Sequence, residues 1–225
     1  PFDWETRSHL FRTHASLAMG ILASFCGLAL HVGTRNGPWD SIDPTCLQLL
    51  YHITGCWSVI SIVWLALTAH EKRTEERRFA LLCAYFFFKA TGSGVLMIAL
   101  LRIEPRVAVT VSLSVCLTLL CFAGWIRTTD RRALAYLGGT LTSAALLWAL
   151  LQSIEMRAPS MTPEQLGPLY LGLLVFALYL ILDSQFIAAK AGDGDSDYFW
   201  HAIEMIYFFE IWALLLGPIG PRLCG

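Results

Sequence analysis

The sequence predicts an all-α integral membrane protein, a compact bundle of seven transmembrane helices. Of its 225 residues, 56% are hydrophobic and only 15% are charged, whereas a soluble domain carries about 25% charged residues. The charges cluster, which leaves several uncharged apolar runs long enough to cross a bilayer. Short loops separate these runs, so we expect consecutive helices to be antiparallel neighbours in one domain, residues 1–225.

The first three predicted helices are residues 12–32, 46–69 and 79–101. A polar start of mixed charge precedes the first, and we expect no cleavable signal peptide there. The chain opens at Pro1 without methionine, which leaves open whether an N-terminal tail precedes it. The first helix is apolar almost all round, so it does not indicate its partner helix. The third contains "ATGSG", a small-residue patch that lets helices approach closely.

The last four predicted helices are residues 107–126, 133–154, 166–189 and 198–219. The loop "IRTTDRR" ends the first of these, and "LGG" in the second is another small-residue patch. The loop "EMRAPSMTPEQ" precedes the third, and "KAGDGDSD" precedes the last; we interpret "DGDSD" as a solvated turn. Each segment has about the 20 residues that a helix needs to span the hydrocarbon core, and helices satisfy every backbone polar group internally in lipid.

Positive charge predicts the orientation, because cytosolic loops carry an excess of Lys and Arg. With seven spans, ten basic residues share a side with the N-terminus: Arg7, Arg12, Lys72, Arg73, Arg77, Arg78, Arg127, Arg131, Arg132 and Lys190. The opposite side carries five: Arg35, Arg102, Arg106, Arg157 and Arg222. We therefore expect a cytosolic N-terminus and a lumenal C-terminus.

Several classes of function are disfavoured. A net charge of −1 provides no basic field for nucleic acid, and the lipid bilayer is the expected partner, with the oligomeric state left open. The seven cysteines are odd in number and form no C-x-x-C, which argues against a disulfide framework or a zinc site. No nucleophile–base or metal-ligand spacing stands out, so we expect neither an enzyme nor a bound cofactor. A seven-helix receptor is disfavoured because neither a D-R-Y-like turn nor N-P-x-x-Y is present.

Four residues charged at neutral pH fall inside the predicted spans away from their ends: Lys89, Asp183, Glu204 and Glu210. A charge at the bilayer centre costs at least about 2.5–3.5 kcal/mol, so such residues usually face the bundle interior and mark a functional path. The alternative is that they form buried ion pairs or hydrogen bonds that only fix helix packing.

Two of these carboxyls, those of Asp183 and Glu204, are expected at the same depth in the membrane. Asp183 precedes the end of the sixth segment by six residues, and Glu204 follows the start of the seventh by six, so both lie about 9 Å below the loop. Glu210 lies about 9 Å deeper. Two carboxyls in a low dielectric cannot both ionise easily, which predicts a proton sensor, a ligand for a hard cation such as Ca²⁺, or both.

A family resemblance centres on the sixth helix. Tyr179, Asp183, Ser184 and Gln185 match the pattern Y-x-x-x-D-[ST]-Q, and "YFWHAIEMIYFFEIW" follows after a polar loop. This stretch resembles the last two helices of the Bax-inhibitor family, the transmembrane BAX inhibitor motif proteins. "VTVSLSVCLTLLCFAGWIRTTD", "AYLGGTLTSAALLWAL" and "RSHLFRTHASLAMGILAS" resemble its fourth helix, fifth helix and entry into the first.

The resemblance implies seven spans, a cytosolic N-terminus and residence in the endoplasmic reticulum or another internal membrane. It also implies a pH-gated Ca²⁺ leak from internal stores, controlled by two aspartates on helices six and seven, and a link to suppression of apoptosis. Asp183 takes the first aspartate's position. The second falls on Phe208, or on Phe209 when the tyrosine is aligned with Tyr207, so either Glu204 or Glu210 replaces it or the pair is broken.

Lys89 is a second departure, because family members often carry an acidic residue near this point. Lys89 is expected either to pair with Asp183 or a glutamate and hold the path shut, or to repel cations. Such divergence is typical of the family's cytomegalovirus members, several of which resemble host regulators of immune recognition and apoptosis.

Two functional hypotheses follow. The first is a cation leak in which Asp183 is a Ca²⁺ ligand; protonation closes the gap between helices six and seven, and deprotonation opens it. The second is a non-conducting membrane adaptor that binds and retains other membrane proteins.

Overall fold

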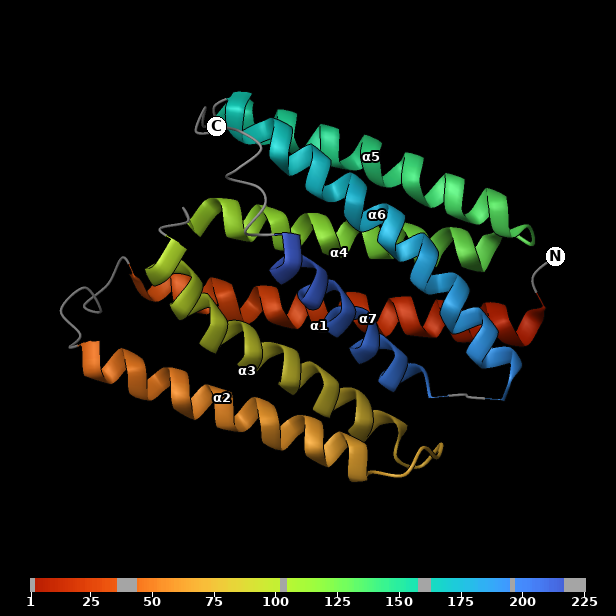
Figure 1. The fold of residues 1–225 in the computed structure, drawn as a ribbon, viewed down its shortest axis with the longest axis horizontal. Coiled ribbons are helices and arrows are strands. Elements are labelled where there is room, and N and C mark those ends of the chain that lie inside the picture. The colour runs from red at the N-terminus through yellow and green to blue at the C-terminus, as the bar shows by residue number, and fades with distance from the viewer. Residues whose placement is uncertain (1–2, 36–43, 102–104, 158–162, 195–196, 217–225) are drawn as a thin grey trace. The chain divides into compact units, whose positions relative to one another are not determined.

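The computed structural model describes the backbone of residues 3–35, 44–101, 105–157, 163–194 and 197–216, and most side chains within 3–28, 45–92, 113–149 and 171–207. Throughout this described part, regular secondary structure is α-helical (Figure 1), which confirms the predicted all-α class. The helices are α1 (Trp4–Arg35), α2 (Pro44–Leu67), α3 (Glu75–Leu101), α4 (Pro105–Thr128), α5 (Arg132–Arg157), α6 (Pro163–Gly192) and α7 (Tyr198–Leu216).

The predicted segments coincide with these helices to within a few residues, except at the start of the chain. Three helices, α2, α4 and α6, begin with proline, whose fixed φ suits the first helical position and whose missing N–H is not needed there. α1 starts at Trp4, eight residues before the predicted start at residue 12. The polar start of the chain is therefore part of the first helix.

Two stretches of the described part are long and apolar enough to cross a membrane: Gln48–Leu67 of α2 and Leu174–Gly192 within α6. A shorter apolar stretch, Leu113–Thr128, lies in α4. α2 exposes large apolar side chains, including Trp57, Val63 and Trp64. Exposed apolar surface of this kind suits contact with lipid. The count of seven membrane spans stays a prediction.

The chain divides into two units, which are described separately. One unit comprises Pro1–Ala15 and Leu120–Gly225, and the other comprises Ser16–Leu119. The first unit therefore contains the start of α1, the end of α4 and all of α5, α6 and α7. The prediction of a single domain is not tested by this division.

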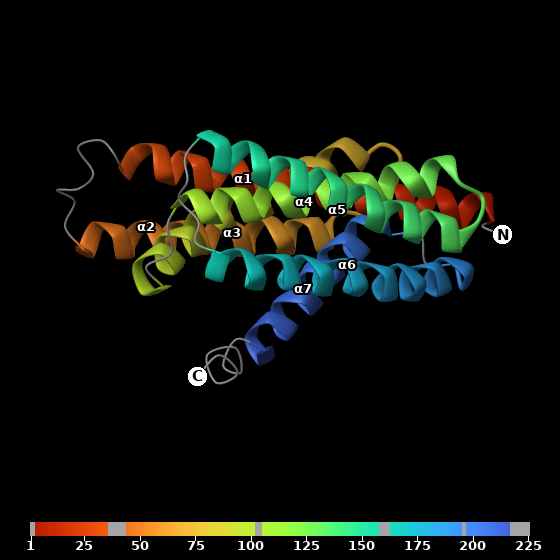
Figure 2. The same cartoon turned by 90° about the horizontal axis from the view of Figure 1, so that it is seen from above.

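In the unit Ser16–Leu119, α2 and α3 pack along each other (Figures 1 and 2). A Cβ at Gly92 on α3 would lie 2.6 Å from Oγ1 of Thr54 on α2, so Gly92 of the patch "ATGSG" lies at a close helix contact, as predicted. α1 packs on α3 through small residues spaced one or two turns apart. They are Gly20, Ser24 and Gly27: the two glycines lie against Phe86 and Phe87, and the Ser24 hydroxyl donates to the Phe86 carbonyl at 3.1 Å.

In the other unit, α5 packs closely on the end of α4. A Cβ at Gly138 would lie 2.4 Å from the ring of Trp125, and one at Gly139 would lie 3.0 Å from the ring of Phe122. The patch "LGG" is therefore a packing surface, as predicted. In addition, the Trp125 indole N–H donates to Thr142 Oγ1 at 2.9 Å.

α6 and α7 form a hairpin at one end of this unit. Gly194, just after α6, has a φ of +93°, a left-handed conformation that glycine adopts at helix ends without steric cost. Asp197 caps α7, because its Oδ1 accepts the Trp200 backbone N–H at 3.2 Å. From this turn α7 runs back and crosses α6 at an angle (Figure 2).

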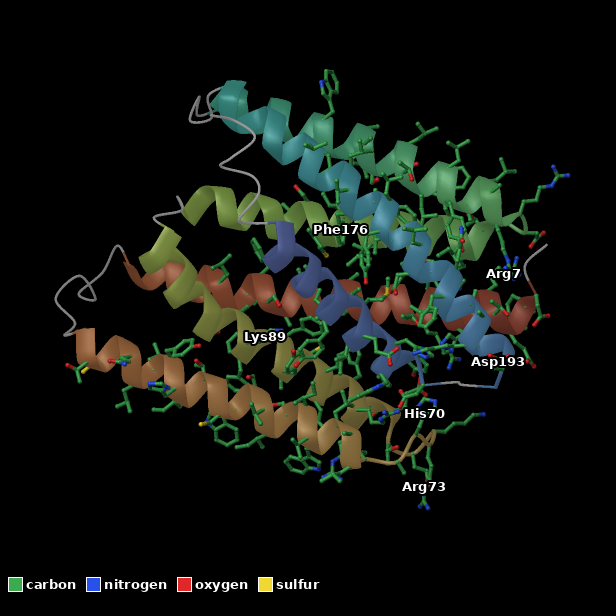
Figure 3. All side chains as sticks on the ribbon, in the orientation of Figure 1. Arg7, His70, Arg73, Lys89, Phe176 and Asp193 are labelled. Carbon is green, nitrogen blue, oxygen red and sulfur yellow. The ribbon has the colours of Figure 1, made fainter. Side chains whose placement is uncertain are left out.

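The start of α1 is fixed to the same unit by polar and aromatic contacts. Arg7 forms an ion pair with Asp130, between α4 and α5, and the Arg127 guanidinium lies 5.0 Å from the ring centroid of Phe11. Figure 3 labels Arg7 near the N-terminus and Asp193 at the end of α6, at the same end of this unit. These contacts explain why the polar start of the chain is helical.

Candidate functional site on α6 and α7

Asp183 lies on α6 at the edge of its buried face. Leu180, Ser184 and Ile187 are buried on this helix, whereas Leu182 and Phe186 are exposed, as expected for a helix with one face packed and one face in lipid. The Asp183 side chain is partly buried. Its Oδ2 atom is buried, and no described residue gives it a hydrogen bond. An orphaned buried carboxylate oxygen is costly, which makes Asp183 the principal candidate for a functional group.

Lys190 and Glu204 form an ion pair beside it. The Lys190 Nζ donates to Glu204 Oε2 at 2.7 Å, with side chains 30% and 39% exposed. Nζ also lies 4.9 Å from the ring centroid of Phe186, one turn earlier on α6. The pair joins α6 to α7, and both charges lie within electrostatic reach of the Asp183 carboxyl. The site is therefore two acids and a lysine rather than two acids alone.

Sequence reasoning missed the role of Lys190, which it counted only as a cytosolic loop charge. The spacing contained a signal that would have found it. Lys190 follows Asp183 by seven residues, or two helical turns, so both lie on nearly the same face of α6.

Tyr179 fixes α6 to α7 one turn before Asp183. Its hydroxyl donates to the backbone carbonyl of Met205 on α7 at 3.0 Å. The ion pair and this hydrogen bond hold the first two turns of α7 against α6. Gln185 and Tyr207, the other residues singled out with the motif, are exposed on α6 and α7.

Two histidines connect α1 to this hairpin. His9 Nε2 lies 2.8 Å from His201 Nδ1 on α7, and both side chains are buried. His14 Nε2 lies 3.0 Å from the Ser184 hydroxyl oxygen on α6. Each of the last two helices therefore has a polar contact with the start of α1, a segment that sequence reasoning placed mostly before the first span.

The predicted site residues fall into three groups. Asp183, Ser184, Tyr179 and Glu204 come together on the α6–α7 hairpin. The side chain of Glu210, like those of Phe208 and Phe209, lies outside the described residues, so the choice between Glu204 and Glu210 as second carboxyl stays open. Lys89, labelled on α3 in Figure 3, belongs to the other unit, where its Nζ donates to the Tyr85 hydroxyl at 3.0 Å; its pairing with Asp183 stays a prediction.

Within the described residues, no group of three or more His, Cys, Asp or Glu side chains is arranged to hold a metal ion. The role of Asp183 as a Ca²⁺ ligand stays a prediction.

Comparison with known proteins gives one consistent result. Residues 6–216 match the family described as "Inhibitor of apoptosis-promoting Bax1". The chain is 30% identical over 204 residues to "Probable Bax inhibitor 1" of Paralichthys olivaceus and to "Bax inhibitor 1" of Mus musculus, in each case over 91% of this chain and 81% of the relative. It is 28% identical to "Bax inhibitor 1" of Oryza sativa subsp. japonica, over 90% of this chain and 76% of the relative. No solved structure matches the chain. The match covers both units and the whole α6–α7 site, and the chain belongs to the Bax inhibitor family of membrane proteins.

Proposed function

We propose that this protein is a pH-sensitive cation leak, with Ca²⁺ as the permeant ion, and that Asp183 is the group that binds the ion and senses pH. The observation that carries the proposal is the buried, unpartnered Oδ2 of Asp183. A carboxylate oxygen without a hydrogen-bond donor is available to a proton or to a hard cation. The proposal also includes seven membrane spans, an internal membrane such as the endoplasmic reticulum, and an effect on cell death through stored calcium.

The expected pH response follows from the charge on Asp183. When the carboxyl is protonated it is neutral, offers no anionic ligand and lies beside Glu204 without repelling it. When it is ionised, it attracts cations and repels the Glu204 carboxylate across the hairpin. Flux should therefore rise as pH rises through the titration of Asp183.

Lys190 weakens the repulsion between the Asp183 and Glu204 carboxylates. Because it is bonded to Glu204 at 2.7 Å, it cancels part of the negative charge that faces Asp183. We propose that the Lys190–Glu204 pair holds α6 and α7 together in the closed state, which was one of the two roles expected of Lys89 from the sequence.

The proposal is tested by Ca²⁺ efflux from proteoliposomes across a pH series. Asp183→Asn removes the charge at nearly constant size, and we expect it to lower efflux about tenfold or more, equivalent to about 1.4 kcal/mol, and to flatten the pH profile. The matched control is Asp193→Asn, at an exposed aspartate just after α6, which should leave flux unchanged. Unchanged flux and pH dependence in Asp183→Asn would refute the mechanism.

One observation favours a second candidate, a non-conducting membrane adaptor. Glu204 is engaged by Lys190, so the paired carboxyls implied by the family resemblance are altered in this chain. An adaptor would bind and retain other membrane proteins through its loops or lipid-facing surfaces. Absence of flux from liposomes, together with co-purification of specific membrane proteins from cells, would support this candidate over the leak.

A further inference from the structure

His14 on α1 is a fully buried imidazole with a polar contact at each ring nitrogen. Nδ1 lies 2.8 Å from the Leu10 carbonyl oxygen, and Nε2 lies 3.0 Å from Ser184 Oγ. Ser184 Oγ in turn lies 2.5 Å from the Leu180 carbonyl oxygen. The ring stacks on Phe122 of α4, with centroids 6.4 Å apart and planes 7° from parallel. A continuous line of three contacts therefore runs from α1 to the backbone of α6.

Counting hydrogens shows that this line is one proton short when His14 is neutral. A carbonyl oxygen only accepts, so Nδ1 must carry the hydrogen that bonds Leu10. In the neutral ring Nε2 is then an acceptor, and the single Ser184 hydrogen serves either Nε2 or the Leu180 carbonyl. One of the three contacts always has two acceptors facing each other. With both ring nitrogens protonated, Nε2 donates to Ser184, Ser184 donates to Leu180, and all three contacts hold a hydrogen.

We propose that His14 and Ser184 form a proton-binding site between α1 and α6. The site takes one proton from the aqueous phase onto His14 Nε2. Once Nε2 carries hydrogen, the Ser184 hydroxyl accepts from Nε2 and donates to the Leu180 carbonyl. No heavy atom has to move, because each contact already has hydrogen-bond distance.

The charges around the site set when the proton binds. The two hydrogen-bond contacts and the stacking contact of the ring are all with uncharged groups: the Leu10 carbonyl, the Ser184 hydroxyl and the Phe122 ring. The charged residues nearest to these in sequence are Arg12 on α1, Asp183 on α6 and Arg127 on α4. On α7, which contacts α1 through His201, Glu204 is already paired with Lys190. A buried cation without a paired anion is costly, so the neutral ring is the resting form and the proton binds on acidification.

Ser184 directly follows Asp183 in the motif, so the site gives α6 a second proton-sensitive contact, on a different partner helix from the Asp183 carboxyl. The inference does not depend on the proposed leak, because proton binding to His14 is measured without any ion flux.

The test is NMR of the ¹⁵N-histidine-labelled full chain in lipid across a pH series. The His14 signals are assigned by their loss in His14→Gln or, where that variant does not fold, by proximity to ¹³C-labelled Ser184. We expect hydrogen on Nδ1 alone at high pH and on both nitrogens at low pH. Ser184→Ala removes the acceptor for Nε2–H, so the doubly protonated form should be lost at the pH where the unmodified chain shows it. Ser184→Thr keeps the hydroxyl and should restore it.

Three results would overturn the inference. One is a single protonated nitrogen on His14 at every pH at which the chain stays folded. Another is hydrogen on Nε2 alone at high pH. The third is unchanged conversion in Ser184→Ala, which would show that the serine hydroxyl does not serve the proton. A loss of Ca²⁺ flux in Asp183→Asn has no bearing on these outcomes, so failure of either proposal is recognised separately.

Discussion

Glu204 on α7 has two charged neighbours of opposite sign on α6, Asp183 and Lys190. The lysine is in direct contact and the aspartate acts over a longer distance. The same three side chains therefore contain both an attraction that closes the hairpin and a repulsion that opens it. Which one prevails depends on the protonation of Asp183, because only the ionised carboxyl repels Glu204.

Replacing Lys190 tests this balance. Lys190→Met removes the positive charge and leaves Glu204 to repel Asp183, so we expect Ca²⁺ efflux at neutral pH to increase. A partly exposed ion pair is worth about 1 kcal/mol or less, which corresponds to an increase of roughly fivefold or less. Lys190→Arg keeps the pair and is the control. The double variant Lys190→Met with Glu204→Gln should return flux toward that of the unmodified chain; if it leaks as much as the single variant, Lys190 does not act through Glu204.

At the residue scale, the sequence indicated Asp183 and Glu204 because a charge in an apolar run is conspicuous. It did not indicate Lys190 as a partner, because a basic residue at a helix end is expected from the orientation rule whether or not it pairs. His14 was missed for a related reason. A histidine near the start of a span has no hydropathy signal that separates a buried ring from an exposed one, and its partner Ser184 lies 170 residues away in the chain.

At the scale of elements, α1 shows where hydropathy succeeds and where it fails. Its apolar length was predicted because the run is long and uncharged. Its first two turns were not, because Thr6 and His9 are polar yet buried. His9 contacts His201 on α7 at 2.8 Å, and its backbone carbonyl accepts the Thr13 hydroxyl at 3.0 Å. The packing of α1 on α3 was also not predicted. Glycine and serine, which form this contact on α1, contribute little to an apolar pattern although they allow close helix contact.

The α1–α3 contact predicts a specific effect of added volume. A Cβ at Gly27 would lie 2.7 Å from the Phe87 backbone oxygen and 2.7 Å from Thr91 Oγ1. A backbone oxygen cannot rotate away, so Gly27→Ala must shift one helix, which we expect to cost about 1–3 kcal/mol of stability. The measurement is thermal unfolding of the purified protein in detergent.

The matched control lies on α2. A Cβ at Gly55 would meet no atom within 4 Å, so Gly55→Ala should leave the midpoint unchanged or raise it slightly through better helix propensity. Equal midpoints for Gly27→Ala and Gly55→Ala would show that close contact at Gly27 does not contribute to stability.

At the scale of the whole molecule, the family match covers residues 6–216, which is all of α2 to α7 and α1 from its third residue. Only α2 and α6 contain stretches that qualify as membrane spans by length and composition within the described residues. Helices that carry histidines, serines and paired charges on packed faces, as α1 does, have a lower mean hydropathy than helices surrounded by lipid. Hydropathy averaged over all faces underestimates how well such a helix fits the membrane. Its packed polar groups are satisfied by protein, and only its outer face contacts lipid. This is the physical reason to expect that all seven helices cross the membrane.

Seven spans predict an alternating pattern of exposure for the connections between helices. With a cytosolic N-terminus, the connection between α1 and α2 is lumenal, that between α2 and α3 is cytosolic, and the sides alternate to a lumenal C-terminus. An N-glycosylation acceptor of the form N-x-[ST] is modified only on the lumenal side. We expect acceptors inserted between α1 and α2, between α3 and α4, and after α7 to be glycosylated in cells. Acceptors between α2 and α3, and between α6 and α7, should stay unmodified and serve as controls. Modification between α6 and α7 would place Lys190 and Glu204 at the lumenal face and reverse the side from which the proposed site meets its protons.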